Sequence, residues 1–364
     1  MAQRAYSDRI LLAKERMILP LAVVERDPME EYKLQHDNLV DALKHINRDA
    51  LEAYYELERL RKSVRHSDTK DDKRFNKNLD VVIREKEERL FRLIKFNDYA
   101  AMIMASYPDA KFIDSYDYKR TRNNITDPIL VRGIKAGGHI KHAMEHNRDY
   151  YFIETGYLGN YRCENNQTGR KIYHRIEKNS MQQSRIMDVP DDRWRDLCAF
   201  NPALTYQGWK KPGSKILLIM STDKPFEFYN SNRDDWVNST IATLRQHSDR
   251  EIVIREKAGR GERTNDTIYD ALDQDIYAVV TYNSIAAVEA IQYGIPAFCT
   301  APTAASAVTT GDFSQIENPP KLSEDIIYKW LSSVAYGQFS LNEILTGKAW
   351  SLVQENDTRP TFSY

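Results

Sequence analysis

Two cations stand at the end of a short apolar segment, and together they could hold a phosphate group. The segment Glu251–Lys257 has the sequence EIVIREK, with Arg255 and Lys257 two residues apart. Side chains at that spacing project from the same side of a β-strand. An arginine can bind two phosphate oxygens at once, so this pair predicts a grip on a diphosphate. An ordinary solvated strand end would give the same pattern.

The segment Tyr282–Pro296 combines a helix cap with an isolated carboxylate. Its sequence is YNSIAAVEAIQYGIP, in which Asn283 or Ser284 could cap the following helix. The free N–H groups and positive dipole end of a helix start suit a phosphate. Glu289 stands among alanines and isoleucines, and a carboxylate there needs solvent or a partner such as the two hydroxyls of a ribose. A surface glutamate on a capped helix is the plainer interpretation.

Two further residues are candidates for a general base. Glu154 opens the glycine-bearing segment ETGYLGN at the end of an expected strand, where a carboxylate could take a proton from a hydroxyl. A plain glycine turn is the alternative there. His139 shares a helix face with His142 and His146, at spacings of three and four. Such a face could hold a metal, but a solvated helix face is far commoner, so we predict no metal site.

The middle of the chain is basic although the whole chain is nearly neutral. Residues 131–185 hold ten Lys or Arg and five Asp or Glu, whereas the full sequence has a net charge of -1. Tyr161, Tyr173 and Trp194 lie in or near this stretch. Basic residues interleaved with aromatic ones would suit a nucleic acid or another polyanion, and a solvated face would give the same composition.

The elements that would position these residues alternate between strand and helix. Strands are expected at 128–131, 150–153, 171–176, 215–220, 251–255, 276–281 and 296–300, and helices at 135–147, 234–247, 267–272 and 284–293. This order predicts a parallel sheet with helices on both faces. Ligands bind such a sheet at the carboxyl ends of its strands, which is where Arg255 and Lys257 fall.

The first 108 residues predict helices instead. No glycine occurs before Gly133, and a heptad seam runs through Leu39, Leu43, Ile46, Ala50, Ala53, Leu57, Leu60 and Val64. The polar stretch Ser67–Asn78 would join it to a second helix, which gives an antiparallel hairpin. The hairpin could pack on its own chain, or it could form a coiled coil with a second copy or another partner.

Composition argues against several classes of protein. The chain has 364 residues, of which 41% are hydrophobic and 29% charged, so it can bury the cores of two or three domains. Three scattered cysteines without a CxxC pair indicate a reducing, cytoplasmic environment. The apolar stretch Ile10–Val24 is broken by Lys14–Arg16, so we expect no membrane insertion. The motifs of P-loop NTPases, dinucleotide oxidoreductases and serine hydrolases do not occur in the sequence.

The segment VVTYNSIAAVEAIQYGIPAF resembles the nucleotide-sugar-binding half of GT-B glycosyltransferases, especially those of the capsule-polysaccharide type. Those enzymes have a basic strand end, a further strand, an Asn-Ser helix start and a glutamate before Gly-x-Pro. EIVIREK precedes the segment in the same order. The stretch Ile316–Trp350 resembles uncharacterised phage and bacterial proteins that carry this half. The resemblance covers Lys215–Trp350 and covers the amino half poorly.

This resemblance implies an α/β fold of GT-B type, with Rossmann-like parallel sheets after the helical hairpin. We expect a hairpin region at 1–108, an acceptor-side α/β domain at 109–212, a nucleotide-sugar-binding domain at 213–353 and a tail at 354–364. The donor would be a nucleotide sugar, with a UDP-sugar expected first, and neither cofactor nor metal would be needed.

The resemblance also assigns roles to the candidate residues. Arg255 and Lys257 would hold the diphosphate, Asn283 and Ser284 would lie near a phosphate, and Glu289 would bind the ribose. Retaining enzymes of this type often have a second glutamate eight residues earlier, where this sequence has threonine. The stereochemical outcome therefore stays open.

The implied activity is transfer of a sugar to an acceptor hydroxyl, with Glu154 or His139 as the base. The likeness to phage proteins and the basic middle of the chain suggest a hydroxymethylated pyrimidine in phage DNA as the acceptor, reached in the cytoplasm of the host. A surface polysaccharide or a protein acceptor is also open. The alternatives are a nucleotide-sugar epimerase or hydrolase on the same fold, and a non-catalytic assembly protein that forms homo-oligomers through the hairpin.

Overall fold

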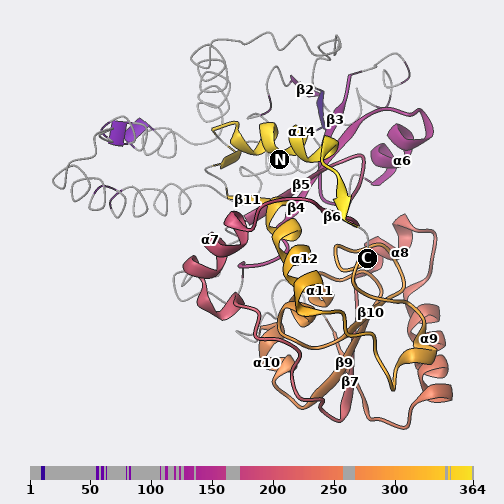
Figure 1. The fold of residues 1–364 in the computed structure, drawn as a ribbon. Helices are drawn as coiled ribbons and strands as arrows, with labels where there is room; N and C mark the ends of the chain where they lie inside the picture. Colours follow the sequence, from indigo (N-terminus) through magenta and orange to yellow (C-terminus); the bar gives the residue numbers. More distant parts are fainter. Residues whose placement is uncertain are drawn as a thin grey trace. The chain divides into compact units, whose positions relative to one another are not determined.

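The computed structural model describes residues 10–12, 111–113, 127–134, 137–160, 173–256, 267–340, 343–344 and 346–362, and scattered positions between 55 and 123. Figure 1 shows the fold, coloured along the sequence from indigo at the N-terminus to yellow at the C-terminus. By its internal contacts the chain divides into two compact units. Unit 1 comprises Met1–Leu130 and Ile344–Lys348, and unit 2 comprises Val131–Glu343 and Ala349–Tyr364.

The described part of unit 1 is built on short paired strands. β1 (Ile10–Leu12) lies antiparallel to β2 (Lys111–Ile113) and to the first two residues of β3 (Ile129–Arg132). The helical expectation for residues 1–108 is therefore wrong at Ile10–Leu12. A three-residue apolar run has no periodicity of its own, so its pairing partners decide its structure. The heptad seam at 39–64 lies largely outside the described residues.

Unit 2 contains a mixed sheet in the order β11, β5, β4 and the Val131–Arg132 end of β3. β5 (Tyr173–Lys178) is antiparallel both to β4 (Tyr150–Thr155) and to β11 (Gln338–Ser340). Helix α6 (Gly137–Glu145) connects β3 to β4. These bounds confirm, to within two residues, the three strands and the helix expected here.

Unit 2 also contains a four-stranded parallel sheet in the order β10, β9, β7, β8. Its strands are β7 (Lys215–Ile219), β8 (Ile252–Arg255), β9 (Ile276–Thr281) and β10 (Ala297–Cys299). The helices between them along the chain are α8 (Asp223–Phe228), α9 (Arg233–His247), α10 (Ile268–Leu272) and α11 (Ala286–Gln292). The predicted alternation and the parallel pairing are both confirmed.

The central strand β7 is buried on both faces. Leu217 and Ile219 belong to a core cluster that includes residues of α10 and α11. Ile216 and Leu218 belong to a second cluster that includes residues of α9. Alternate residues of a strand point to opposite faces, so the apolar run Ile216–Ile219 is what a strand covered on both sides requires.

Several elements of unit 2 were not predicted. They are α8 and β11, described above, with α7 (Asp192–Phe200), the short helices η4 (Pro202–Leu204) and η5 (Phe313–Gln315), α12 (Glu324–Tyr336), α14 (Lys348–Thr358), and the paired strands β6 (Ile186–Met187) and β12 (Thr361–Phe362). The sequence predicts a weakly held tail after Val353, and the structure differs. Asn356 is buried, and its Nδ2 donates to the carbonyl oxygen of Tyr336 at 2.9 Å. This buried amide adds to the burial of Ala349, Trp350 and Val353 on the same helix, so the end of the chain is packed.

No helix among the described residues is long and apolar enough to cross a membrane.

Candidate functional site

The carboxyl edge of the parallel sheet is the place where ligands bind in folds of this kind. At this edge the ends of β7 and β9 are tied together by side chains. Thr281 Oγ1 donates to the carbonyl oxygen of Ile219 at 2.9 Å. Two residues further on, the buried Ser221 Oγ donates to Asn283 Oδ1 at 3.3 Å. These bonds fix the backbone that leads into α11.

Arg255 borders the same edge. Ile219 pairs with Arg255 on one side and with Thr281 on the other. The Arg255 guanidinium is partly buried, and its Nη2 donates to the carbonyl oxygen of Thr267 at 3.2 Å. That bond orients the group through one nitrogen, and an arginine carries five N–H donors. Lys257, the expected second cation, lies outside the described residues, so its role stays a prediction.

At the start of α11, the side chains of the two expected capping residues, Asn283 and Ser284, make different hydrogen bonds. Ser284 Oγ accepts from the backbone N–H of Ala286 at 3.2 Å, whereas the Asn283 side chain is bonded to Ser221. The N-cap position itself is Ile285, so Ser284 satisfies one N–H group at the start of α11 from one residue before the cap, and Asn283 holds the sheet edge. Glu289 is partly exposed while both of its neighbours in sequence are buried. Glu289 comes five positions after Ser284, and five positions correspond to a rise of about 7.5 Å along a helix axis.

Glu154 lies in the mixed sheet, beside cations. It is directly opposite Arg175 in the pairing of β4 with β5. Its Oε1 accepts from the N–H of Thr155 at 2.9 Å and from Thr155 Oγ1 at 3.2 Å. Burial lowers the pKa of Arg132, and the charge of Glu154 opposes that shift. The arrangement gives Glu154 the position of a counter-ion, and its predicted role as a base stays a prediction.

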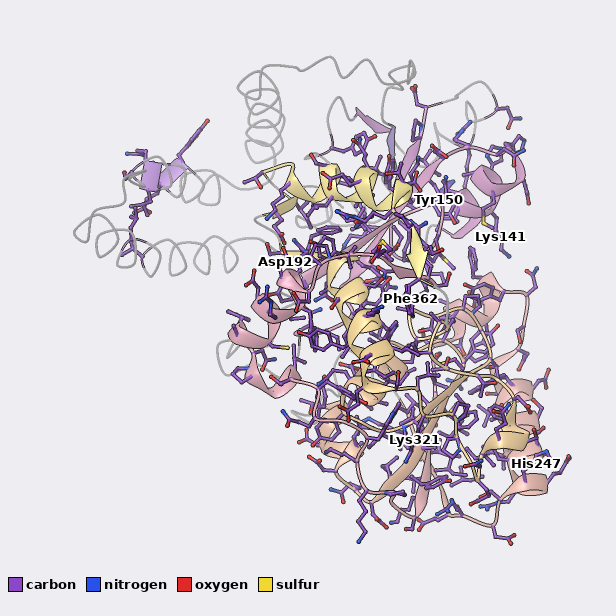
Figure 2. The ribbon with its side chains drawn as sticks, in the orientation of Figure 1. Lys141, Tyr150, Asp192, His247, Lys321 and Phe362 are labelled. Atoms are coloured by element: carbon purple, nitrogen blue, oxygen red, sulfur yellow. The ribbon has the colours of Figure 1, made fainter. Side chains whose placement is uncertain are left out.

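His139 lies on α6 and is buried. Of the other two histidines on this helix, His142 stacks on His146 with ring centroids 4.0 Å apart. The helix packs against the end of α8, because Lys141 Nζ donates to Asn230 Oδ1 at 2.9 Å (Figure 2). Among the described residues, no group of three or more metal-ligating side chains comes together.

Aromatic side chains connect the mixed sheet to the parallel sheet. Tyr282, the residue before Asn283, stacks on Phe226 at 4.1 Å and meets Tyr229 edge-on at 6.2 Å. Burial raises the pKa of Tyr229, and the nearby Arg175 charge opposes that shift. Burial, with Tyr229 nearby, also raises the pKa of Tyr150 to about 12. Arg175 on β5 and Tyr150 on β4 therefore lie within electrostatic reach of Tyr229, which itself contacts Tyr282.

The structure thus brings Arg255, Asn283 and Ser284 to one edge, and it leaves Glu154 and His139 on the mixed-sheet part of unit 2. Sequence reasoning missed Ser221, Tyr229 and Arg175. Ser221 could have been found, because it follows the expected strand KILLIM directly. Tyr229 and Arg175 come together only through tertiary packing. Trp194 is buried in the core and Arg175 is also buried, so neither can stack on or contact a nucleic acid as the basic segment suggested.

Comparisons with known proteins give a limited likeness. No family model matches the chain, and no curated protein matches it. Among solved structures, the Thermosulfurimonas dismutans KpsC beta Kdo 2,4 transferase has 14% identity and a TM-score of 0.38, and the match covers 59% of this chain and 86% of that one. The KpsC beta Kdo 2,7 transferase of the same organism has 15% identity and a TM-score of 0.41, and the match covers 66% and 88%. The functional argument therefore rests on this chain's own residues.

Proposed function

We propose that this protein transfers a glycosyl group from a nucleotide-diphosphate sugar to an acceptor hydroxyl. The proposal is carried by the position of Arg255 at the carboxyl edge of the parallel sheet. There Arg255 pairs with Ile219 of β7, and the segments that follow β7 and β9 are joined by the hydrogen bond between Ser221 and Asn283. An arginine beside a capped helix start supplies the positive potential that a diphosphate needs. The GT-B architecture expected from the sequence belongs to this proposal.

The reaction requires one bond to form and one to break. A base takes the proton of the acceptor hydroxyl, and the acceptor oxygen forms a bond to the anomeric carbon. The bond from that carbon to the diphosphate breaks, and its electron pair leaves with the diphosphate. Arg255 stabilises the charge that develops there. Asn283 and Ser284 position the phosphate end of the donor, and Glu289 binds the ribose.

The acceptor and the base are the open parts of this proposal. Glu154 and His139 remain the candidates for the base. A DNA acceptor gains no support from the described residues, because two of the side chains that suggested it are buried. The proposal therefore specifies an acceptor hydroxyl without assigning it to a nucleic acid, a polysaccharide or a protein.

A thermal-denaturation panel with UDP-, GDP-, CMP- and dTDP-sugars tests the donor site. At about 100 times its dissociation constant, the true donor should stabilise the protein by about 2.7 kcal/mol. Arg255→Ala should abolish this stabilisation. The matched control is Arg245→Ala, because Arg245 is also an arginine bonded to one backbone carbonyl, that of Arg250, but it lies at the end of α9.

Two results would count against the proposal. The first is the absence of stabilisation by any of these donors. The second is equal stabilisation of wild type and Arg255→Ala, since the diphosphate would then bind elsewhere. Once a donor is known, release of nucleotide without any acceptor would favour the hydrolase or epimerase alternative.

A further inference from the structure

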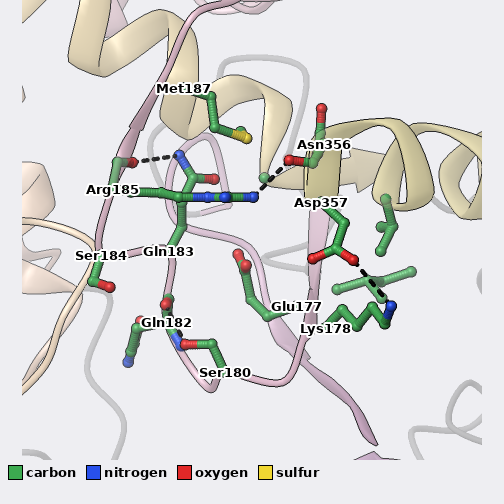
Figure 3. A pocket seen from close by; sticks show the side chains of 13 residues that line it. Glu177, Lys178, Ser180, Gln182, Gln183, Ser184, Arg185, Met187, Asn356 and Asp357 are labelled. Carbon is green, nitrogen blue, oxygen red and sulfur yellow. Dashed lines mark hydrogen bonds and ion pairs between the residues drawn. The ribbon is translucent and has the colours of Figure 1, made fainter. Parts of the chain in front are cut away.

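A cavity of about 200 Å³ lies in unit 2, apart from the residues argued for the donor site (Figure 3). It is formed by the end of β5, the loop that leads into β6, and α14. Its polar lining includes Glu177, Lys178, Gln183, Arg185, Asn356 and Asp357. Neither Arg255 nor the start of α11 contributes to it. The proposed transfer reaction therefore makes no use of this cavity.

Opposite charges face each other across the cavity without touching. Figure 3 shows the carboxyl group of Glu177 directed toward the guanidinium of Arg185. Arg185 Nη2 donates to the carbonyl oxygen of Asn356 at 2.6 Å, and Glu177 Oε1 accepts from Tyr157 Oη at 2.8 Å. In the part of the chain that the structure describes, no ion pair joins Glu177 to Arg185. The gap between them can hold a molecule that bonds to both.

Glu177 can act as a donor or an acceptor of hydrogen bonds near neutral pH. Burial raises the pKa of its carboxyl group to about 7, against the opposing effects of the Tyr157 hydroxyl and of the charges of Arg175 and Arg185. Both protonation states are therefore populated at that pH. A carboxyl group of this kind suits a hydroxyl, which can itself donate or accept.

The walls of the cavity are polar and buried. Gln183 and Asn356 are both buried. Gln183 Nε2 donates to Ser333 Oγ at 2.6 Å, while Gln183 Oε1 has no hydrogen-bond partner among the described residues. A buried amide oxygen without a partner is costly. A bound group that donates to it would remove that cost.

Gly337 keeps the cavity open. A Cβ atom at this position would collide with Gln183 Oε1 and lie 3.3 Å from Glu177 Oε1. The backbone of Gly337 has φ -89° and ψ 0°, which any residue can adopt. The position therefore needs a small residue for space and not for its backbone conformation.

When Glu177 is ionised, the charges that line the cavity balance. Lys178 is bonded to Asp357 at 2.9 Å and to Asp149 at 3.3 Å. The remaining charged groups of the lining are Arg185 and Glu177, which have opposite charges. A charged ligand would leave one of these two groups without compensation. The volume of the cavity, about 200 Å³, equals the share of about seven water molecules and is near that of one sugar ring.

We infer that this cavity binds one neutral polyol of the size of a monosaccharide, held between Glu177 and Arg185. Its hydroxyls accept from the guanidinium and exchange hydrogen bonds with the carboxyl group and with Gln183. The inference does not depend on the proposed donor site.

Ligand-detected NMR and calorimetry on the full chain test the inference. The probes are D-glucose, D-galactose, D-mannose and myo-inositol, with sodium acetate and sodium sulfate as anionic comparisons. A ligand of this size should bind with a dissociation constant on the order of 1 mM. Gly337→Ala should weaken binding of the preferred polyol at least about tenfold, a loss that follows from filling the space the ligand needs.

Matched variants separate loss of the site from loss of the fold. Gly138→Ala is the control, because a Cβ atom at Gly138 meets nothing within 4 Å, and it should bind the polyol as wild type does. Glu177→Gln keeps the shape of the site and should also weaken binding, which keeps the test decisive if Gly337→Ala does not fold. Arg255→Ala should bind the polyol as wild type does, because Arg255 does not line the cavity. A failed polyol inference can therefore be told apart from a failed donor-site proposal.

Three results would overturn the inference. One is the absence of saturable binding of all four polyols at about ten times the expected dissociation constant. Another is binding that is unchanged in Glu177→Gln and in folded Gly337→Ala. The third is saturable binding of acetate or sulfate in preference to every polyol, which would make the cavity an anion site.

Discussion

Ser221 and Asn283 join the ends of two parallel strands through a single side-chain hydrogen bond of 3.3 Å. The bond uses the amide oxygen of Asn283, and Ser284 Oγ is the side-chain atom that accepts from the N–H of Ala286 at the start of α11. Ser221 and Asn283 flank the edge where Arg255 ends its strand. The bond is therefore a positioning element for the proposed phosphate site.

Replacing Ser221 by alanine tests that positioning role. The variant should lose about 1 kcal/mol of unfolding free energy, since one buried hydrogen bond is removed and Asn283 Oδ1 is left without its donor. Binding of the nucleotide sugar should weaken as well, because the freed Asn283 amide can rotate away from the edge. Chemical denaturation and donor titration measure the two effects. In the control Ser239→Ala, the lost hydroxyl bonds only the Trp236 carbonyl oxygen, and a comparable loss of donor binding there would contradict the assignment.

Glu177 should make the stability of the protein fall as the pH rises. Its carboxyl pKa is raised from 4.5 to about 7, so the folded state holds a proton that the unfolded state releases between these values. The contribution is fully present below pH 4.5 and is lost as the pH rises through about 7. A shift of this size corresponds to at most about 3 kcal/mol.

The variant Glu177→Gln should remove this pH dependence. Relative to wild type, it should gain stability between about pH 5 and about pH 8, as followed by urea denaturation at each pH. Tyr157→Phe is the complementary change, because the Tyr157 hydroxyl lowers the pKa of Glu177. In that variant, the loss of stability should move to higher pH. Parallel pH profiles of wild type and Glu177→Gln would show that the carboxyl group is not shifted.

Two adjacent residues of α14 should differ sharply in importance. Asn356→Ala should cost about 1 to 3 kcal/mol, because it leaves the carbonyl oxygen of Tyr336 without its donor at a buried position. Asp357→Asn breaks an ion pair with Lys178 whose acidic side chain is 43% exposed, and it should cost at most about 1 kcal/mol. Thermal and chemical denaturation compare the two. Equal costs would mean that α14 is not fastened by the buried amide.

Gly294, in the Gly-Ile-Pro sequence after α11, has a conformational reason to be glycine. Its φ is +85°, and a Cβ atom would collide with the carbonyl oxygen of Gly208. Gly294→Ala should therefore cost at least about 2 kcal/mol from the left-handed backbone and the collision together. Gly138→Ala, whose Cβ would be in open space on α6, should leave the melting temperature unchanged or slightly raised. A neutral Gly294→Ala would show that this turn can relax.

The sequence predicted the parallel sheet well and the rest of unit 2 less well, for a physical reason. Strands such as Ile276–Thr281 are short, mostly apolar runs that are buried along their whole length, so the local sequence is enough to predict them. The paired strands β6 and β12 have two residues each, and such strands exist only through their partner. Helix α14 buries Ala349, Trp350 and Val353 together with the polar Asn356, and a stripe this short gives a weak helical signal in the sequence.

The candidate site residues also divide into those that the sequence could place and those that depend on tertiary packing. Arg255, Asn283 and Ser284 could be placed from sequence because strand ends of a parallel sheet converge by topology. The bond between Ser221 and Asn283 depends on side-chain positions that topology does not fix. The Glu177 cavity could not be foreseen, since its lining residues come from segments far apart in the chain.

The ion pair between Lys178 and Asp357 has a consequence for the order of folding, because it joins residues 179 positions apart. The bond between Thr281 and Ile219 closes over 62 residues, so the parallel sheet can assemble while its segment is still being synthesised. The walls of the Glu177 cavity are complete only after α14 has packed, because α14 supplies part of the lining. In pulsed hydrogen exchange during refolding, amides of β7 and β9 should gain protection before those of β6 and β12, because β6 pairs only with β12 at the other end of this unit's sequence. The cavity would then be among the last features of the fold to form.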